Sequence, residues 1–161
     1  MTVWDFALQN ESDGIEFYSA KAEENKENAL HRVFTMLIKD EQRHYDLLEH
    51  YRDHSDKVFP SDDALASLPS LFKDPESLVQ DVYTAYDQLK TYKMALEIEK
   101  KGIDLYHKLA SESEDLDQKQ LFQFLRSQEQ QHYELFEELI KRVSRPEEWV
   151  EAAEFGRRED Y

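Results

Sequence analysis

An internal repeat constrains the fold of this chain more than any other feature of its sequence. Adding 88 to a position in residues 7–49 gives, without a gap, the corresponding position in residues 95–137. The identical pairs include Glu11/Glu99, Gly14/Gly102, Ile15/Ile103, Tyr18/Tyr106, Phe34/Phe122, Leu37/Leu125, Glu41/Glu129, His44/His132 and Tyr45/Tyr133. Two copies of this length predict two similar halves related by an internal pseudo-twofold axis.

Each half has the pattern of a helical hairpin. Thr2 and Asp5 indicate a helix start, and apolar residues then recur at helical spacing until a polar turn at residues 23–28. A second helix is predicted over residues 29–54, a third from Asp74-Pro75-Glu76 to about residue 110, and a fourth over residues 117–143. The prolines between residues 55 and 75 predict a long crossover between the two hairpins. One long crossover is typical of the ferritin-like type of antiparallel four-helix bundle, so we expect an all-α fold.

The chain length fits one such domain. We expect the bundle to occupy residues 1–145 of the 161 and a C-terminal extension, residues 146–161, to follow it. Pro146 is expected to separate the fourth helix from a short helix and a tail that contains Trp149 and Phe155.

Composition excludes several classes of function. The formal net charge of −16 disfavours nucleic acid as a partner, because like charges repel. The chain has no cysteine, which removes thiolate metal sites, iron–sulfur clusters and cysteine nucleophiles. No apolar run is long enough to span a membrane, and the N-terminus lacks the pattern of a signal peptide, so a cytoplasmic location is expected. Any metal must be bound by Glu, Asp and His.

The polar residues of the repeat have the spacing of a metal site. Glu41 and His44, like Glu129 and His132, form Glu-x-x-His, which places both side chains on one helix face a turn apart. A lone glutamate on the partner helix of each hairpin, Glu11 or Glu99, completes the set. One Glu from each of two helices and Glu-x-x-His from the other two is the ligand pattern of di-iron and di-manganese carboxylate bundles. Apolar neighbours such as Leu37 and Leu125 argue against solvated helix faces, since buried carboxylates are costly without a cation.

At these residues the sequence resembles the rubrerythrin family, especially members that lack a rubredoxin domain. The matching strings are Glu11-Ser-Asp-Gly14-Ile-Glu-Phe17-Tyr18, Glu41-Gln-Arg-His44, Glu99-Lys-Lys-Gly102-Ile-Asp-Leu105-Tyr106 and Glu129-Gln-Gln-His132. The resemblance implies two iron ions bridged by Glu41 and Glu129, with Glu11 and Glu99 as terminal ligands and one histidine on each metal. Tyr18 and Tyr106 are the candidate catalytic residues. They return to the face of Glu11 and Glu99 and are expected to hydrogen-bond ligand carboxylates or to pack in the core. Manganese or zinc would fit the same ligands.

Two departures from the family pattern leave the reaction open. Peroxidase-type rubrerythrins are expected to have a further glutamate one turn after the third-helix ligand, where this chain has Gly102. Without cysteine, the chain also has no rubredoxin-type electron relay, so an external donor protein is expected. The leading hypothesis is an oxidoreductase that reduces hydrogen peroxide or oxygen, as a homodimer or higher homo-oligomer. The alternatives are a ferroxidase or iron-handling protein, and a bundle whose metals have a structural or partner-binding role.

Overall fold

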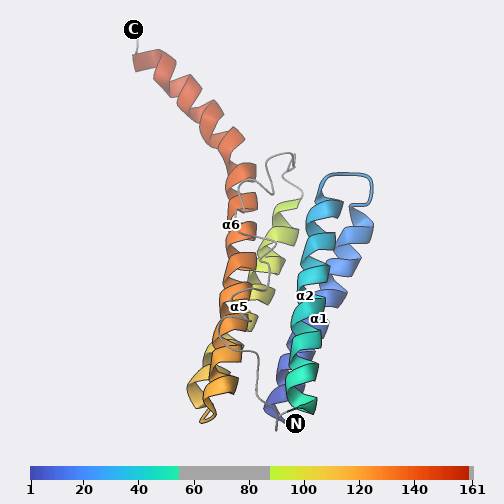
Figure 1. Ribbon diagram of the computed structural model, residues 1–161. Helices are drawn as coiled ribbons and strands as arrows, with labels where there is room; N and C mark the ends of the chain where they lie inside the picture. The colour runs from blue at the N-terminus through green and yellow to red at the C-terminus, as the bar shows by residue number, and fades with distance from the viewer. Residues whose placement is uncertain (55–87, 160–161) are drawn as a thin grey trace.

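The part of the chain that the structure describes forms four helices arranged as two antiparallel hairpins. The computed structural model describes the backbone of residues 1–54 and 88–159 and the side chains of these ranges up to residue 143. The helices are α1 (Val3–Glu24), α2 (Leu30–Asp53), α5 (Leu89–Glu112) and α6 (Leu116–Glu159). Figure 1 shows α1 beside α2 and α5 beside α6, and these described ranges contain no strand. The predicted all-α fold is confirmed.

The direction of the helices agrees with a long crossover. In Figure 1, α2 ends at the lower end of the bundle, where the N-terminus lies, and α5 begins at the upper end. The segment predicted as the crossover, between residues 55 and 75, lies outside the described residues. The predicted start of the third helix at Asp74-Pro75-Glu76 lies outside the described residues.

Local sequence explains the helix ends. Thr2 caps α1 through a capping box. The Thr2 hydroxyl accepts from the Asp5 backbone N–H at 3.2 Å, and the Asp5 carboxylate accepts from the Thr2 backbone N–H at 2.7 Å. This confirms the helix start predicted from these two residues. The Asp115 carboxylate accepts from the backbone N–H groups of Asp117 and Gln118, at 2.8 and 3.1 Å, and caps the start of α6.

The fourth helix does not end where the sequence predicted. We expected it to stop near Val143 because of Pro146, but α6 continues to Glu159. Figure 1 shows that α6 bends away from the bundle in this part. Proline removes one backbone hydrogen bond and crowds the preceding turn, which kinks a helix without always ending it. The residues that follow Pro146 include Glu147, Glu148, Ala152 and Ala153, which favour helix. The division into residues 1–145 and 146–161 stays a prediction.

Most of the buried apolar side chains in the described residues form two clusters. The upper cluster contains Tyr18, Ala22, Leu30, Val33, Phe34, Leu37, Tyr92, Ala95, Leu135, Phe136, Leu139 and Val143. The lower cluster contains Ala7, Leu8, Leu48, Tyr51, Tyr106, Leu109, Ala110, Leu121, Phe122 and Leu125. The offset of 88 residues relates one cluster to the other. Tyr18 stacks on Phe34 in the upper cluster, and the corresponding Tyr106 stacks on Phe122 in the lower cluster, each pair with ring centroids 6.2 Å apart. This is the predicted pseudo-twofold symmetry, with its axis between the clusters.

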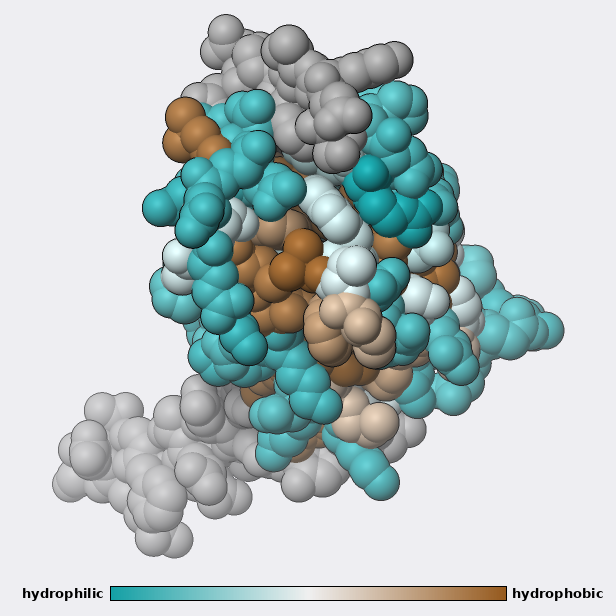
Figure 2. Space-filling model, turned by 90° about the horizontal axis from the view of Figure 1, so that it is seen from below, coloured by the Kyte–Doolittle hydropathy of each residue, from teal (hydrophilic) through white to brown (hydrophobic). Residues whose placement is uncertain are grey.

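The lower end of the bundle exposes some apolar surface. Figure 2 looks onto this end and shows hydrophobic side chains surrounded by hydrophilic ones. Met1, Val3, Phe6 and Leu116 are exposed large apolar residues in or next to the first turns of α1 and α6. None of the helices in the described ranges has the length and apolar character that a membrane span needs.

Candidate metal centre

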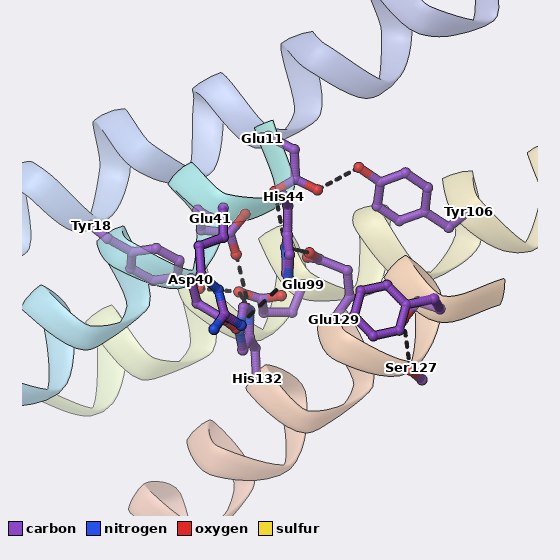
Figure 3. A network of polar contacts seen from close by, with 12 residues as sticks. Glu11, Tyr18, Asp40, Glu41, His44, Glu99, Tyr106, Ser127, Glu129 and His132 are labelled. Carbon is purple, nitrogen blue, oxygen red and sulfur yellow. Dashed lines mark hydrogen bonds and ion pairs between the residues drawn. The ribbon is translucent and has the colours of Figure 1, made fainter. Parts of the chain in front are cut away.

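A layer of charged side chains lies between the two apolar clusters, and all four helices contribute to it. The six predicted ligands are brought together in this layer, where each is at most 2% exposed. Figure 3 shows their side chains converging from the two hairpins. The helices contribute as the repeat requires: Glu11 from α1, Glu41 and His44 from α2, Glu99 from α5, and Glu129 and His132 from α6.

The six residues form two overlapping groups of four. One group is Glu11, Glu41, His44 and Glu129, and the other is Glu41, Glu99, Glu129 and His132. Within each group, one potential ligand atom of every residue lies within 4.8 Å of the others. Glu41 and Glu129 belong to both groups, which is the placement that bridging ligands need.

Both histidines turn the same ring nitrogen toward the carboxylates. His44 Nδ1 lies 3.5 Å from Glu11 Oε2 and 3.4 Å from Glu129 Oε1. His132 Nδ1 lies 2.9 Å from Glu41 Oε1 and 3.4 Å from Glu99 Oε1. The Nδ1 atoms therefore face the centre of the layer, and the Nε2 atoms face outward. The two rings stack with centroids 5.8 Å apart.

The two buried tyrosines each contact a glutamate of the other hairpin. The Tyr18 hydroxyl donates to Glu99 Oε1, and the Tyr106 hydroxyl donates to Glu11 Oε1 (Figure 3). Burial raises the pKa of both tyrosines well above the ordinary value, and the charges of Glu99 and Glu11 respectively raise it further. Both hydroxyls therefore keep their protons and act as hydrogen-bond donors. Each bond orients one carboxylate and joins the two hairpins.

Replacing Tyr106 with Phe is expected to weaken binding of divalent metal roughly tenfold or more, because Glu11 loses the donor that orients it. The repeat predicts a similar loss for Tyr18→Phe. Calorimetric titration of the metal-free protein measures the change. Tyr133→Phe is the matched control, since Tyr133 is only partly buried and lies outside both groups of four. Unchanged affinity in both variants at the buried positions would contradict the orienting role.

Glycine is needed at two helical positions so that the shared glutamates fit. A Cβ atom at Gly14 would lie 3.2 Å from Glu41 Oε2, and one at Gly102 would lie 2.8 Å from Glu129 Oε2. Both glycines have ordinary helical backbone, so the need is for space and not for a positive φ. Gly102 also occupies the position at which peroxidase-type rubrerythrins are expected to have a further glutamate. With Glu129 where it is, no side chain fits there without displacing the Glu129 carboxylate.

The two glycines differ in clearance, which allows a matched test. Gly102→Ala is expected to displace the Glu129 carboxylate and to weaken metal binding more than Gly14→Ala, whose contact needs a shift of only a few tenths of an ångström. Alanine also favours helix over glycine by about 0.5–1 kcal/mol, so neither variant should lose the fold. Metal titration and thermal melting of the metal-free variants check both statements. Equal affinities for the two variants would show that clearance is not limiting.

Without metal, the layer retains protons. Burial raises the pKa of Glu41 well above its ordinary value, and the charges of Glu11 and Glu129 raise it further. Burial also raises the pKa of Glu129 well above its ordinary value, and the charges of Glu99 and Glu11 raise it further. Burial lowers the pKa of His44, but the charge of Glu11 outweighs it and raises the pKa to about 10. Four carboxylates cannot all ionise at this distance without added positive charge, and protons supply it.

The donor set fits a pair of divalent cations. Glu11 Oε2, Glu99 Oε2 and Glu129 Oε1 are buried and have no hydrogen-bond partner among the described residues, and the same holds for His44 Nδ1. Buried polar atoms without partners are rare in folded proteins and need a reason. Two divalent ions bring four positive charges to four glutamates, and oxygen with imidazole ligands suits iron, manganese and zinc.

Sequence reasoning missed one residue of this layer, Asp40. It is 1% exposed, and its carboxylate contacts both His132 and Arg43 at 2.5 Å. The available signal was its position four residues before His44, which puts it on the same helix face. Six other histidine and acidic residues with metal-binding side chains lie outside the layer and are exposed: His31, His50, His54, Glu97, Asp104 and His107.

The fold and this cluster define the class of ferritin-like bundles with a buried centre of carboxylates and histidines. The family model described as rubrerythrin matches residues 3–140, so the chain belongs to the rubrerythrin family. The resemblance seen in the Glu-x-x-His strings is thereby confirmed. Searches of curated proteins and of solved structures gave no match. Rubrerythrins are oxidoreductase-type di-iron proteins and typically bind iron.

Proposed function

We propose that this protein is an oxidoreductase that binds two iron ions in the buried layer and reduces hydrogen peroxide or oxygen. Glu41 and Glu129 bridge the ions. Glu11 and His44 complete one half, and Glu99 and His132 complete the other. The observation that carries the proposal is the pair of overlapping four-residue groups, which share the two bridging glutamates. A pair of bound iron ions supplies two electrons to a small oxidant.

The residues around the centre prepare it for such chemistry. Tyr18 and Tyr106 fix the terminal carboxylates, and the apolar clusters above and below the layer exclude bulk water. The histidines face the ions with Nδ1, so binding requires that these atoms release the protons they hold in the metal-free protein.

A surface cavity of about 300 Å³ reaches the layer on the side of His44. It is lined by Arg43, His44, Asp46, Leu47 and Phe124. Peroxide and oxygen are small enough to use such an opening, whereas larger organic substrates would not pass His44, which is only 2% exposed. The cavity supports a small oxidant as substrate.

Stopped-flow mixing tests the reaction. The protein loaded anaerobically with two equivalents of Fe²⁺ is mixed with hydrogen peroxide or with oxygenated buffer, and oxidation is followed by absorbance. Rapid oxidation by peroxide, and slower oxidation by oxygen, is expected for the peroxidase activity. Much faster reaction with oxygen would instead support a ferroxidase. Metal analysis of protein purified without oxygen identifies the native ion, and zinc in both halves without activity after iron loading would favour a structural role.

The ferroxidase alternative has one observation in its favour. Gly102 occupies the position of the expected seventh ligand of peroxidase-type members, and a side chain there would have to displace the Glu129 carboxylate. Light scattering separates reduction of an oxidant from iron storage, since a small oligomer cannot enclose a mineral. An external electron donor, a homodimeric or larger assembly and a cytoplasmic location remain predictions.

A further inference from the structure

The two halves of the centre differ in what holds the outer nitrogen of the histidine. His132 Nε2 lies 2.5 Å from Asp40 Oδ2, a charge-assisted hydrogen bond between α6 and α2. Arg43 donates to the other oxygen, Oδ1, also at 2.5 Å, and so fixes the carboxylate in this orientation. Asp40 is 1% exposed, so water does not compete for this contact.

His44 has no equivalent of this contact. The repeat places Gln128 at the position that corresponds to Asp40, and Gln131 at the position that corresponds to Arg43. His44 Nε2 lies 3.8 Å from Asp40 Oδ2, which is beyond hydrogen-bond distance, and has no hydrogen-bond partner among the described residues. The pair of Asp40 and Arg43 thus breaks the symmetry that the six predicted ligands obey.

A carboxylate on the outer nitrogen of a ligand imidazole has two effects. It fixes the tautomer that leaves Nδ1 free for the metal, and it makes the imidazole a stronger donor to the cation. A neutral glutamine supplies no such charge. Loss of contacts of this kind typically costs about 10–100-fold in metal affinity. Arg43 reduces the effect only in part, because its side chain is 32% exposed and water shares its charge.

We propose that Asp40 is a positioning residue that makes the two halves unequal, so that the half containing His132 binds its divalent ion first and more tightly than the half containing His44. This inference rests on the proposed dimetal centre. The half that binds its ion less tightly is also the one that the surface cavity reaches, through His44.

Titration of the metal-free protein with Zn²⁺, followed by calorimetry, tests the inference without any redox step. The intact protein is expected to bind two ions in two steps, the first at least about tenfold tighter. Asp40→Asn keeps the size of the side chain and removes its charge, and it should weaken the first step about 10–100-fold and bring the two steps together. Asp53→Asn on the same helix is the matched control, because Asp53 is exposed and lies outside the cavity and both groups of four, and it should leave both steps unchanged.

A gain-of-function variant supports the test if Asp40→Asn disturbs folding. Gln128→Asp introduces a carboxylate at the matching position and should tighten the second step. With one equivalent of Co²⁺, NMR should show a shifted, slowly exchanging imidazole N–H signal that is lost in His132→Ala and in Asp40→Asn, and retained in His44→Ala. Equal affinities of the two steps in the intact protein would overturn the inference while leaving the proposed function intact. Failure to bind zinc, cobalt or iron at all would overturn both.

Discussion

Glu129→Gln is expected to abolish binding of a metal pair and, at the same time, to raise the melting temperature of the metal-free protein. Glu129 belongs to both groups of four, so its loss removes a ligand from each ion. Loss of an outer hydrogen-bond partner alone costs about 10–100-fold in affinity, and loss of a shared ligand should cost at least as much for each ion. Metal titration and atomic absorption of the purified variant measure this effect.

The gain in stability follows from the charge of the layer. In the metal-free protein, burial and the charges of Glu99 and Glu11 raise the pKa of Glu129, so folding resists its ionisation. Glutamine has nearly the same shape and no charge, and the gain should be about 1 kcal/mol or more and should grow with pH. Glu137→Gln, two turns further along α6 and exposed, is the control and should change neither property. A metal-free Glu129→Gln protein that melts below the unaltered protein at pH 8 would contradict this account.

The metal-free protein is expected to lose stability as pH rises from about 6.5 to 10, and the metal-loaded protein to lose much less. The folded state raises the pKa of His44 from 6.5 to about 10, because the charge of Glu11 outweighs burial. Between these values the folded protein binds more protons than the unfolded chain, so the free energy of unfolding falls as pH rises. Glu41 and Glu129, whose pKa values burial also raises, act in the same direction from a lower pH.

Metal ions replace these protons, so the free energy of unfolding of the metal-loaded protein should depend much less on pH. At a free concentration of 100 to 1,000 times the dissociation constant, a bound ion adds about 2.7–4.1 kcal/mol to the free energy of unfolding. Urea unfolding at pH 6.5, 8 and 9.5, with chelator or with excess Zn²⁺, measures both slopes. If the chelated protein were as stable at pH 9.5 as at 6.5, the protonated layer would not exist in solution.

The repeat explains how much of the structure could be predicted. Glu11, Glu41 and His44 recur at the same offset of 88 residues as the apolar residues around them. A single alignment of the two copies therefore predicted both the two hairpins and the six clustered residues. The start of the first helix could also be predicted, since the capping box at Thr2 depends only on two residues three positions apart.

Three features were beyond the sequence pattern, each for a different reason. The tyrosines were expected near ligand carboxylates, but the pattern could not tell that each would contact the opposite hairpin, which depends on how the hairpins dock. Asp40 could not be predicted from the repeat, because the second copy has Gln128 at the corresponding position. The continuation of α6 past Pro146 depends on a balance between one lost hydrogen bond and favourable neighbours, which proline alone does not decide.

The exchange of hydrogen bonds by Tyr18 and Tyr106 has a consequence for assembly. Within a hairpin, the helices are joined by short turns and can pair early, since nearby segments meet at low entropic cost. Glu11 and Glu99, however, each accept a hydrogen bond from a tyrosine of the other hairpin, and each group of four takes residues from both hairpins. A single hairpin therefore supplies three of the four residues of one group and only one residue of the other, so neither group is complete without both hairpins. On the proposed ligand assignment, a chain cut between residues 55 and 87 would give two fragments that metal ions bring back together.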